Sequence, residues 1–204
     1  MIRLEAFVAT VASSPIAPWS KLAPWELTSR STTLVDDLFA HLPGSDFTVS
    51  ANVAIHRTAT IEPGATLKGP LIVGAGSFVA TGAYIRGGTW IDERCTIGPG
   101  VEVKSSFLFA GTTLAHFNFV GDSIVGAGVN LEAGSIVCNA RNERADGVIH
   151  VRLGADLHRI TPGKFGALIG DGCRIGANAV VAPGALLAPG SLVARTALCD
   201  QETS

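Results

Sequence analysis

Branched aliphatic residues recur at every sixth position over much of the chain. The series runs without interruption from Ile55 to Val103 and returns over residues 169–193. A six-residue period fits neither a helix with 3.6 residues per turn nor one long alternating strand. It fits a chain that turns a corner every six residues and stacks short strands into a prism. We therefore predict an all-β fold, a parallel β-helix of hexapeptide repeats.

The repeats divide the chain into an N-terminal segment and a solenoid. Residues 1–48 do not follow the repeat, and within them Ser31–Leu42 places three leucines on one helical face after a Ser/Thr start. We expect residues 1–48 to form a short helical cap over an end of the solenoid, because an open end exposes backbone and apolar core. Residues 49–198 then form the β-helix domain.

Two interruptions of the repeat are candidates for function, since local rules break most often where function requires it. In the first, Leu114–Asp122, the phase of the inward positions shifts, and this stretch contains His116. The second is a long loop insertion, residues 139–167, which carries several Arg and His residues. Polar insertions on one face of a solenoid usually form its binding surface. The last residues, 194–204, are expected to fray.

Composition narrows the possible functions. The formal net charge is −2, which gives no electrostatic reason to expect nucleic acid or an anionic membrane as a partner. No run of 18 apolar residues and no convincing secretory signal occur, so we expect a cytoplasmic protein that does not enter a membrane. The four cysteines contain no C-x-x-C spacing, which favours small buried residues over a zinc or redox site.

His116 is the candidate for chemistry among the five histidines. Neutral imidazole can take a proton from an amine near neutral pH, and such a base usually needs an orienting partner on its other ring nitrogen. Glu102 and Lys104 are candidate partners, because they precede His116 by about one coil. Structural or surface roles explain the other four: His41, His56, His150 and His158.

The stretch from His116 to Asn139, HFNFVGDSIVGAGVNLEAGSIVCN, resembles one known enzyme domain. This is the acetyltransferase domain of the bifunctional N-acetylglucosamine-1-phosphate uridyltransferase/glucosamine-1-phosphate acetyltransferase family, which reads approximately G-H-L-x-Y-L-G-D-x-x-I-G-x-x-x-N-I-G-A-G-x-I-x-C-N. The spacing matches without a gap, and general hexapeptide similarity covers about residues 50–195. The resemblance implies a left-handed β-helix of the hexapeptide-repeat acyltransferase superfamily, a homotrimer, and acetyl-CoA as co-substrate.

The same resemblance implies a role for individual residues. His116 would be the general base that deprotonates the amino group of a small amino-sugar acceptor, and Glu102 would support it. At Ala133 the backbone would approach the acetyl thioester, where an N–H group could stabilise the oxyanion. The remaining implied contacts are Arg86 and Lys104 with the acceptor's phosphate, Asn130 and Asn139 with its sugar, and Ala177 with the coenzyme.

Three departures from the family pattern concern the acceptor side. Phe119 stands where the family has Tyr, and Glu132 replaces a Gly. A longer insertion, with Arg141 and Arg144, replaces a short loop that carries a phosphate-binding Lys. Acyl transfer is therefore implied more firmly than the identity of the acceptor. The residues before the repeats are too few for a nucleotidyltransferase domain, so we expect the acetyltransferase unit alone.

Two other functions are compatible with a β-helix. A chain that kept the fold and lost catalysis would be a scaffold or ligand-binding protein, which the altered acceptor positions favour. A hydratase similar to the γ-class carbonic anhydrases would hold zinc with three closely spaced histidines. No second histidine lies within 30 residues of His116, so we predict no metal site.

Overall fold

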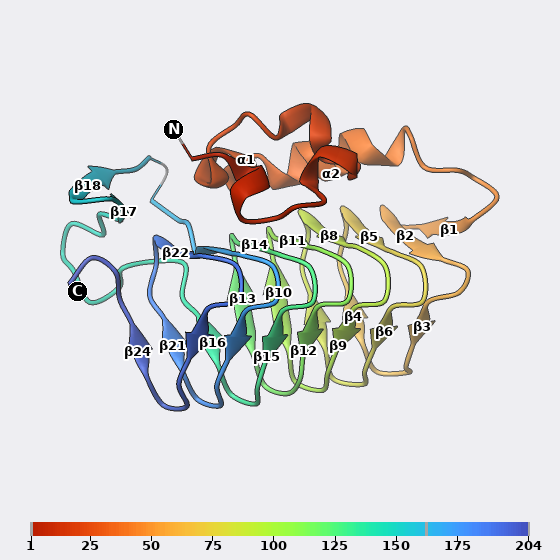
Figure 1. The fold of residues 1–204 in the computed structure, drawn as a ribbon. Coiled ribbons are helices and arrows are strands. Elements are labelled where there is room, and N and C mark those ends of the chain that lie inside the picture. Colours follow the sequence, from red (N-terminus) through yellow and green to blue (C-terminus); the bar gives the residue numbers. More distant parts are fainter. Residues whose placement is uncertain (1, 162, 204) are drawn as a thin grey trace.

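The computed structural model describes residues 2–161 and 163–203 and is a three-sided β-helix (Figure 1). The chain passes from one sheet to the next at each corner, so each sheet collects one strand from every coil. Strands of successive coils pair in parallel, as in Glu102↔Phe119 and Thr113↔Asn130. The predicted left-handed parallel β-helix is confirmed.

The three sides of the prism are named here sheets A, B and C. Sheet A contains β1 (Phe47–Ser50), β2 (Val53–His56), β5 (Leu71–Val73), β8 (Thr89–Ile91), β11 (Phe107–Leu108), β14 (Ile124–Val125), β19 (Ala167–Ile169) and β22 (Ala185–Leu187). Sheet B contains β3 (Thr60–Ile61), β6 (Phe78–Val79), β9 (Thr96–Ile97), β12 (Thr113–Leu114), β15 (Asn130–Leu131), β20 (Arg174–Ile175) and β23 (Leu192–Val193). Sheet C contains β4 (Thr66–Leu67), β7 (Tyr84–Ile85), β10 (Glu102–Lys104), β13 (Phe119–Gly121), β16 (Ile136–Val137), β21 (Val180–Val181) and β24 (Leu198–Cys199).

Branched aliphatic side chains from all three sheets fill the inside of the prism. Ile85, Val103 and Ile175 are fully buried, and each belongs to the six-residue series of its repeat block. Small residues such as Cys95 and Ala179 sit at the corners, where little room remains. Burial of this apolar surface drives the coiling, and each coil shares its hydrogen bonds with the next.

The six-residue period contracts to five at two corners, and this corrects the sequence analysis. The inward residues of this region are Val103, Leu108, Leu114, Val120 and Val125. Both five-residue steps lead from sheet C to sheet A, around Ser105 and Asp122, whose φ angles are 47° and 49°. The predicted segment, Leu114–Asp122, thus reaches the second of these corners only at its last residue, and the step that contains His116 keeps six residues. Phe109 misled the analysis because it keeps the period while packing outside the prism.

The N-terminal segment lies along sheet A and does not cover an end of the prism, which corrects its expected position (Figure 1). It contains three 3₁₀ turns (Leu4–Ala6, Val11–Ser13 and Ala17–Trp19) and two helices, α1 (Pro24–Ser29) and α2 (Ser31–Phe39). Helix α2 begins where predicted and ends before Leu42, since Pro43 restricts the residue before it.

Bulky apolar side chains on the outer face of sheet A explain this position. Ile72, Trp90 and Phe107 point outward and are buried against the N-terminal segment in a second hydrophobic core. The rings of Trp90 and Phe109 lie 5.3 Å apart, edge to face. The segment therefore covers one side of the prism and leaves the outer faces of sheets B and C uncovered.

The predicted loop insertion contains an antiparallel hairpin, β17 (His150–Leu153) and β18 (Asp156–Arg159). Ile149, Val151 and Phe165 anchor the insertion in the second core, where the ring of Phe165 meets that of Trp25 at 6.0 Å. The insertion therefore has a packed structure of its own. None of the helices formed by the described residues has the length and hydrophobicity needed to cross a membrane.

The end of the chain is held in place, so the predicted fraying is wrong for residues up to 203. Arg141, whose side chain is 3% exposed, contacts Asp200 at 2.7 Å and Glu202 at 3.0 Å. Arg144 and His150 also pair with Glu202. The insertion's arginines therefore fasten the last coil, which explains why Arg141 and Arg144 are not free for a ligand.

Candidate active site

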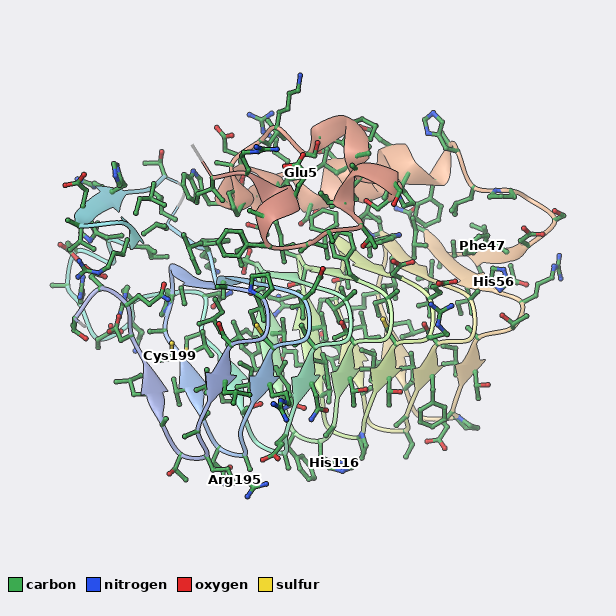
Figure 2. The ribbon with its side chains drawn as sticks, in the orientation of Figure 1. Glu5, Phe47, His56, His116, Arg195 and Cys199 are labelled. Atoms are coloured by element: carbon green, nitrogen blue, oxygen red, sulfur yellow. The ribbon has the colours of Figure 1, made fainter. Side chains whose placement is uncertain are left out.

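His116 lies at the corner where the chain passes from sheet B to sheet C, called here the B–C edge. It follows β12 and precedes β13, in a corner of regular length. The side chain is exposed at the border of the prism (Figure 2), and within the described part of the chain nothing hydrogen-bonds to its ring. An imidazole in this position is accessible to a substrate and to a neighbouring molecule.

The same corner of the following coils carries Ala133 and Ala177. The carbonyl of His116 accepts a hydrogen bond from the amide of Gly134 at 2.9 Å, and that of Ala133 accepts from Asn178 at 3.0 Å. These bonds stack the three residues along one edge, although they are far apart in the sequence. The N–H of Ala133 has no acceptor among the described residues, so it is available to a ligand.

Asn118, which the sequence analysis did not select, fixes the backbone around His116. Its side chain is 2% exposed, and its Oδ1 accepts the N–H of His116 at 3.1 Å. Its Nδ2 donates to the carbonyl of Glu132 at 2.8 Å and to the Ser135 hydroxyl at 2.9 Å. Asn118 thus ties the corner of His116 to the corner of Ala133. The signal was present, because a polar amide occupies a small buried position of the repeat.

Two of the expected site residues, one for the acceptor's phosphate and one for the support of the base, form an ion pair on sheet C. The guanidinium of Arg86 lies 3.1 Å from the carboxylate of Glu102, and both side chains are more than a third exposed. No hydrogen bond or ion pair joins Glu102 to His116 in the described residues. The expected support of the base by Glu102 is therefore not formed within this single chain, and it stays a prediction.

A second polar group lies where sheet C passes to sheet A. Lys104 Nζ is 3.1 Å from Asp122 Oδ2, and the side-chain amide of Asn139 donates to the same oxygen. The shortened corners bring these residues of three successive coils together. Asp122, which is 7% exposed, was missed because only His116 was singled out within the segment Leu114–Asp122.

Asn130 stands apart from both groups, on the outer face of sheet B. It lines an open groove of about 430 Å³ together with Glu132, Arg174, Leu192 and Arg195. The groove runs beside the B–C edge, next to the corners of Ala133 and Ala177. Asn130 is thus separated from Asn139, with which the resemblance grouped it, by the width of sheet C.

The cysteines and histidines form no other reactive centre that the structure describes. Burial raises the pKa of Cys95 to about 12, which keeps its thiol protonated and unreactive. Desolvation also raises the pKa of Cys138, Cys173 and Cys199. Within the described residues no group of three His, Cys, Asp or Glu side chains could hold a metal ion.

Comparison with known proteins identifies the family. The model of the GMPPB C-terminal domain matches residues 49–156, just over half of the 204 residues. This chain belongs to the GMPPB C-terminal domain family. The matched region of this family member includes the corners that carry His116 and Ala133 and ends before the corner of Ala177.

Curated relatives support the resemblance read from the sequence, which is confirmed. The family member is 39% identical over 110 residues to the bifunctional protein GlmU of Acidithiobacillus ferrooxidans, an alignment that covers 52% of this chain and 23% of GlmU. It is 32% identical over 161 residues to a bifunctional sugar-1-phosphate nucleotidylyltransferase/acetyltransferase of Sulfurisphaera tokodaii, covering 76% and 39%. The chain thus spans well under half the length of these relatives.

Solved structures give only weak matches. The acetyltransferase domain of PglB from Neisseria gonorrhoeae, in complex with acetyl coenzyme A, aligns with a TM-score of 0.40 and 14% identity, over 85% of this chain and 67% of that one. A single-residue mutant of perosamine N-acetyltransferase from Caulobacter crescentus, in complex with CoA and GDP-perosamine, aligns with a TM-score of 0.34 and 16% identity, over 90% and 69%. Superpositions at these scores add nothing on the site of this family member.

Proposed function

We propose that this protein is an acetyl-CoA-dependent acyltransferase that acetylates the amino group of a small sugar. One observation carries the proposal: an exposed imidazole, His116, shares the B–C edge with an unpaired backbone N–H, that of Ala133. A general base and an oxyanion donor side by side are the two groups that acyl transfer to an amine requires.

In this mechanism His116 removes a proton from the acceptor amine while the amine nitrogen attacks the thioester carbonyl carbon. The negative charge that develops on the carbonyl oxygen is stabilised by the N–H of Ala133. The carbon–sulfur bond then breaks, and the leaving thiolate takes the proton from the imidazolium. The acetyl group ends on the amine, and the coenzyme leaves as a thiol. The protein supplies positioning and charge stabilisation, and no metal enters the step.

The acceptor would bind on sheet C. Arg86 and Lys104 are the cations there that could bind a phosphate. Each is already paired with a carboxylate, Arg86 with Glu102 and Lys104 with Asp122. A phosphate must therefore compete for them, which favours an acceptor with modest charge at this position. Phe119, on the outer face of sheet C, offers an apolar surface where the family has a hydroxyl.

The coenzyme would lie along the B–C edge, in contact with Ala133 and Ala177. We propose a homotrimer in which this edge meets a neighbouring copy, since sheet A is already covered and sheets B and C are not. Exposed apolar side chains near the edge favour such packing: Phe117, Leu192 and Leu198 are each more than 60% exposed. The cytoplasmic location stays a prediction.

The test offers the protein acetyl-CoA together with glucosamine-1-phosphate or another amino sugar. Acetylation is measured as the release of free thiol from acetyl-CoA. The variant His116→Ala should lower kcat/KM by about 100- to 10,000-fold, the usual contribution of a general base, without weakening coenzyme A binding. The matched control is His158→Ala, which removes an exposed histidine from the hairpin and should leave kcat/KM unchanged. Turnover that survives His116→Ala would contradict the assignment of the base.

The competing proposal is a β-helix that binds ligands without catalysis. Phe119 in place of Tyr favours it, because one acceptor contact is lost. The protein is a binding module if it binds coenzyme A and amino sugars, but neither free nor nucleotide-linked amino sugars cause thiol release from acetyl-CoA. If coenzyme A does not bind at all, both the enzyme and its cofactor assignment fail.

A further inference from the structure

One side chain bridges three coils at the B–C edge, directly beside the proposed coenzyme site. The carboxylate of Glu132 accepts two hydrogen bonds from Arg195, Nε to Oε2 at 2.8 Å and Nη2 to Oε1 at 2.9 Å. Its Oε2 also accepts the backbone N–H of Ala177 at 2.8 Å. We call these three residues the edge clasp. Figure 2 shows Arg195 on the same border of the prism as His116.

The clasp engages the backbone N–H of Ala177, a residue that the coenzyme is proposed to contact. Along this edge the N–H of Ala133 is free, whereas that of Ala177, one coil further, is already bonded to a carboxylate. The guanidinium of Arg195 is likewise paired. Glu132 therefore covers part of the surface that the proposed function assigns to the coenzyme.

The repeat itself provides a comparison that separates the two contacts of Glu132. Glu62 occupies the same position on sheet B in the first coil and accepts the N–H of Thr81 at 2.7 Å. In the part of the chain that the structure describes, no arginine pairs with Glu62. The amide contact is thus a recurring device of this edge, and the arginine is an addition specific to the clasp.

The groove beside the clasp has the charge that a phosphate requires. Arg174 and Arg195 both line it, and no described carboxylate pairs with Arg174. Guanidinium groups bind phosphate oxygens through paired hydrogen bonds, so a released Arg195 is a suitable ligand for such an anion. Glu132, in contrast, repels it.

The clasp can open without unfolding the edge. Arg195 is 74% exposed and Glu132 35% exposed, and ion pairs of this kind contribute little and are weakened by salt. Hydrogen bonds from Arg195 and Ala177 lower the pKa of Glu132 to about 2, so the carboxylate stays charged at any physiological pH. An arriving anion, and not protonation, is then what opens the pair.

We infer that Glu132 competes with acetyl-CoA for Ala177 and Arg195, so that the edge clasp must open before the coenzyme binds fully. Once opened, Arg195 turns from the carboxylate to a phosphate of the coenzyme. Glu132 thereby lowers the affinity for the coenzyme, and Arg195 raises it. This inference rests on the proposed function, because it requires the coenzyme to lie along the B–C edge.

The test is the dissociation constant of coenzyme A, measured by isothermal titration calorimetry on the full chain. Glu132→Ala should bind coenzyme A about 3- to 10-fold more tightly than the wild type, and Arg195→Ala about 3- to 10-fold more weakly. Alanine is a fitting replacement at position 132, since Ala80, Ala115 and Ala194 hold the same place on other coils. A merely structural clasp predicts instead that both variants change binding in the same direction.

Two variants serve as matched controls. Glu62→Ala removes the equivalent amide contact on the first coil, and Arg94→Ala removes an exposed arginine paired with Glu93 at another edge. Both should leave the dissociation constant unchanged. Weaker or unchanged binding by Glu132→Ala, with coenzyme A still bound by the wild type, would overturn the clasp alone. Failure of the wild type and of all variants to bind coenzyme A would overturn the proposed function and the clasp with it.

Discussion

At the scale of single residues, the B–C edge depends on side chains that never meet a substrate. The side-chain amide of Asn118 makes all of its hydrogen bonds to backbone groups and to Ser135. Because the amide is buried, water cannot replace these partners. Because buried polar groups without partners are costly, this amide defines one conformation of the corner. The imidazole of His116 is placed by that corner.

Replacing this amide tests the dependence. Asn118→Ala should lower the free energy of unfolding by about 2–3 kcal/mol, since several buried backbone groups lose their partner. Urea unfolding at neutral pH measures it. The control is Asn178→Gly at the same edge: Asn178 is exposed and its φ is 56°, which glycine adopts without strain, so the stability should change by less than about 0.5 kcal/mol. Equal stabilities of the two variants would show that Asn118 does not fix the corner.

At the scale of elements, the insertion and the residues that follow β24 stabilise each other through Arg141. This side chain is almost fully buried and faces Asp200, Glu202 and the more exposed Glu143. A buried arginine is favourable only while its carboxylates remain charged. The hydrogen bonds from Arg141 hold the pKa of Asp200 below its usual value. The C-terminal coil is therefore predicted to be sensitive to acid.

This sensitivity can be measured with Asp200→Asn. The variant should be less stable than the wild type by about 2 kcal/mol at pH 7, because a charged partner of Arg141 is lost. A carboxyl whose pKa is lowered by folding stabilises the fold at pH values above its pKa in the unfolded chain, near 3.9. That stabilisation is lost as the pH falls through its pKa in the folded protein. The difference between the two proteins should therefore shrink from pH 5 towards pH 2 in urea unfolding.

Glu143→Gln provides the comparison for this pH series. Glu143 also contacts Arg141, at 3.3 Å, but its side chain is 60% exposed, so its removal should cost less than about 0.5 kcal/mol. A stability difference for Asp200→Asn that stays constant between pH 7 and pH 2 would contradict the ionic origin of the contact.

At the scale of the whole molecule, the proposed site is divided between two borders of sheet C. His116 lies at the border with sheet B, whereas the group of Lys104, Asp122 and Asn139 lies at the border with sheet A. The N-terminal segment covers sheet A and leaves sheets B and C for neighbours. A trimer that places the edge of one copy against sheet C of the next would unite the two groups.

Mixed assemblies test this division. His116→Ala and Lys104→Ala, each inactive alone, should regain activity when co-expressed, because random mixing places both intact residues at about one interface in four. Thiol release by the purified mixture measures the gain, and mass spectrometry of the intact assembly verifies that mixed trimers form. Mixed trimers without any regained activity would show that both residues serve the same copy's site.

The hydrophobic period by itself determined the coiled architecture, because each six-residue step must bury one aliphatic side chain and turn one corner. It also gave the start of helix α2 and, through the motif around His116, residues that do stack at one edge. Only the tertiary structure decided the five-residue corners, since Phe109 keeps the period while facing the second core. Likewise, the partners of Arg141, Asn118 and Glu132 lie on other coils, and contacts between coils are set by packing that the local sequence does not record.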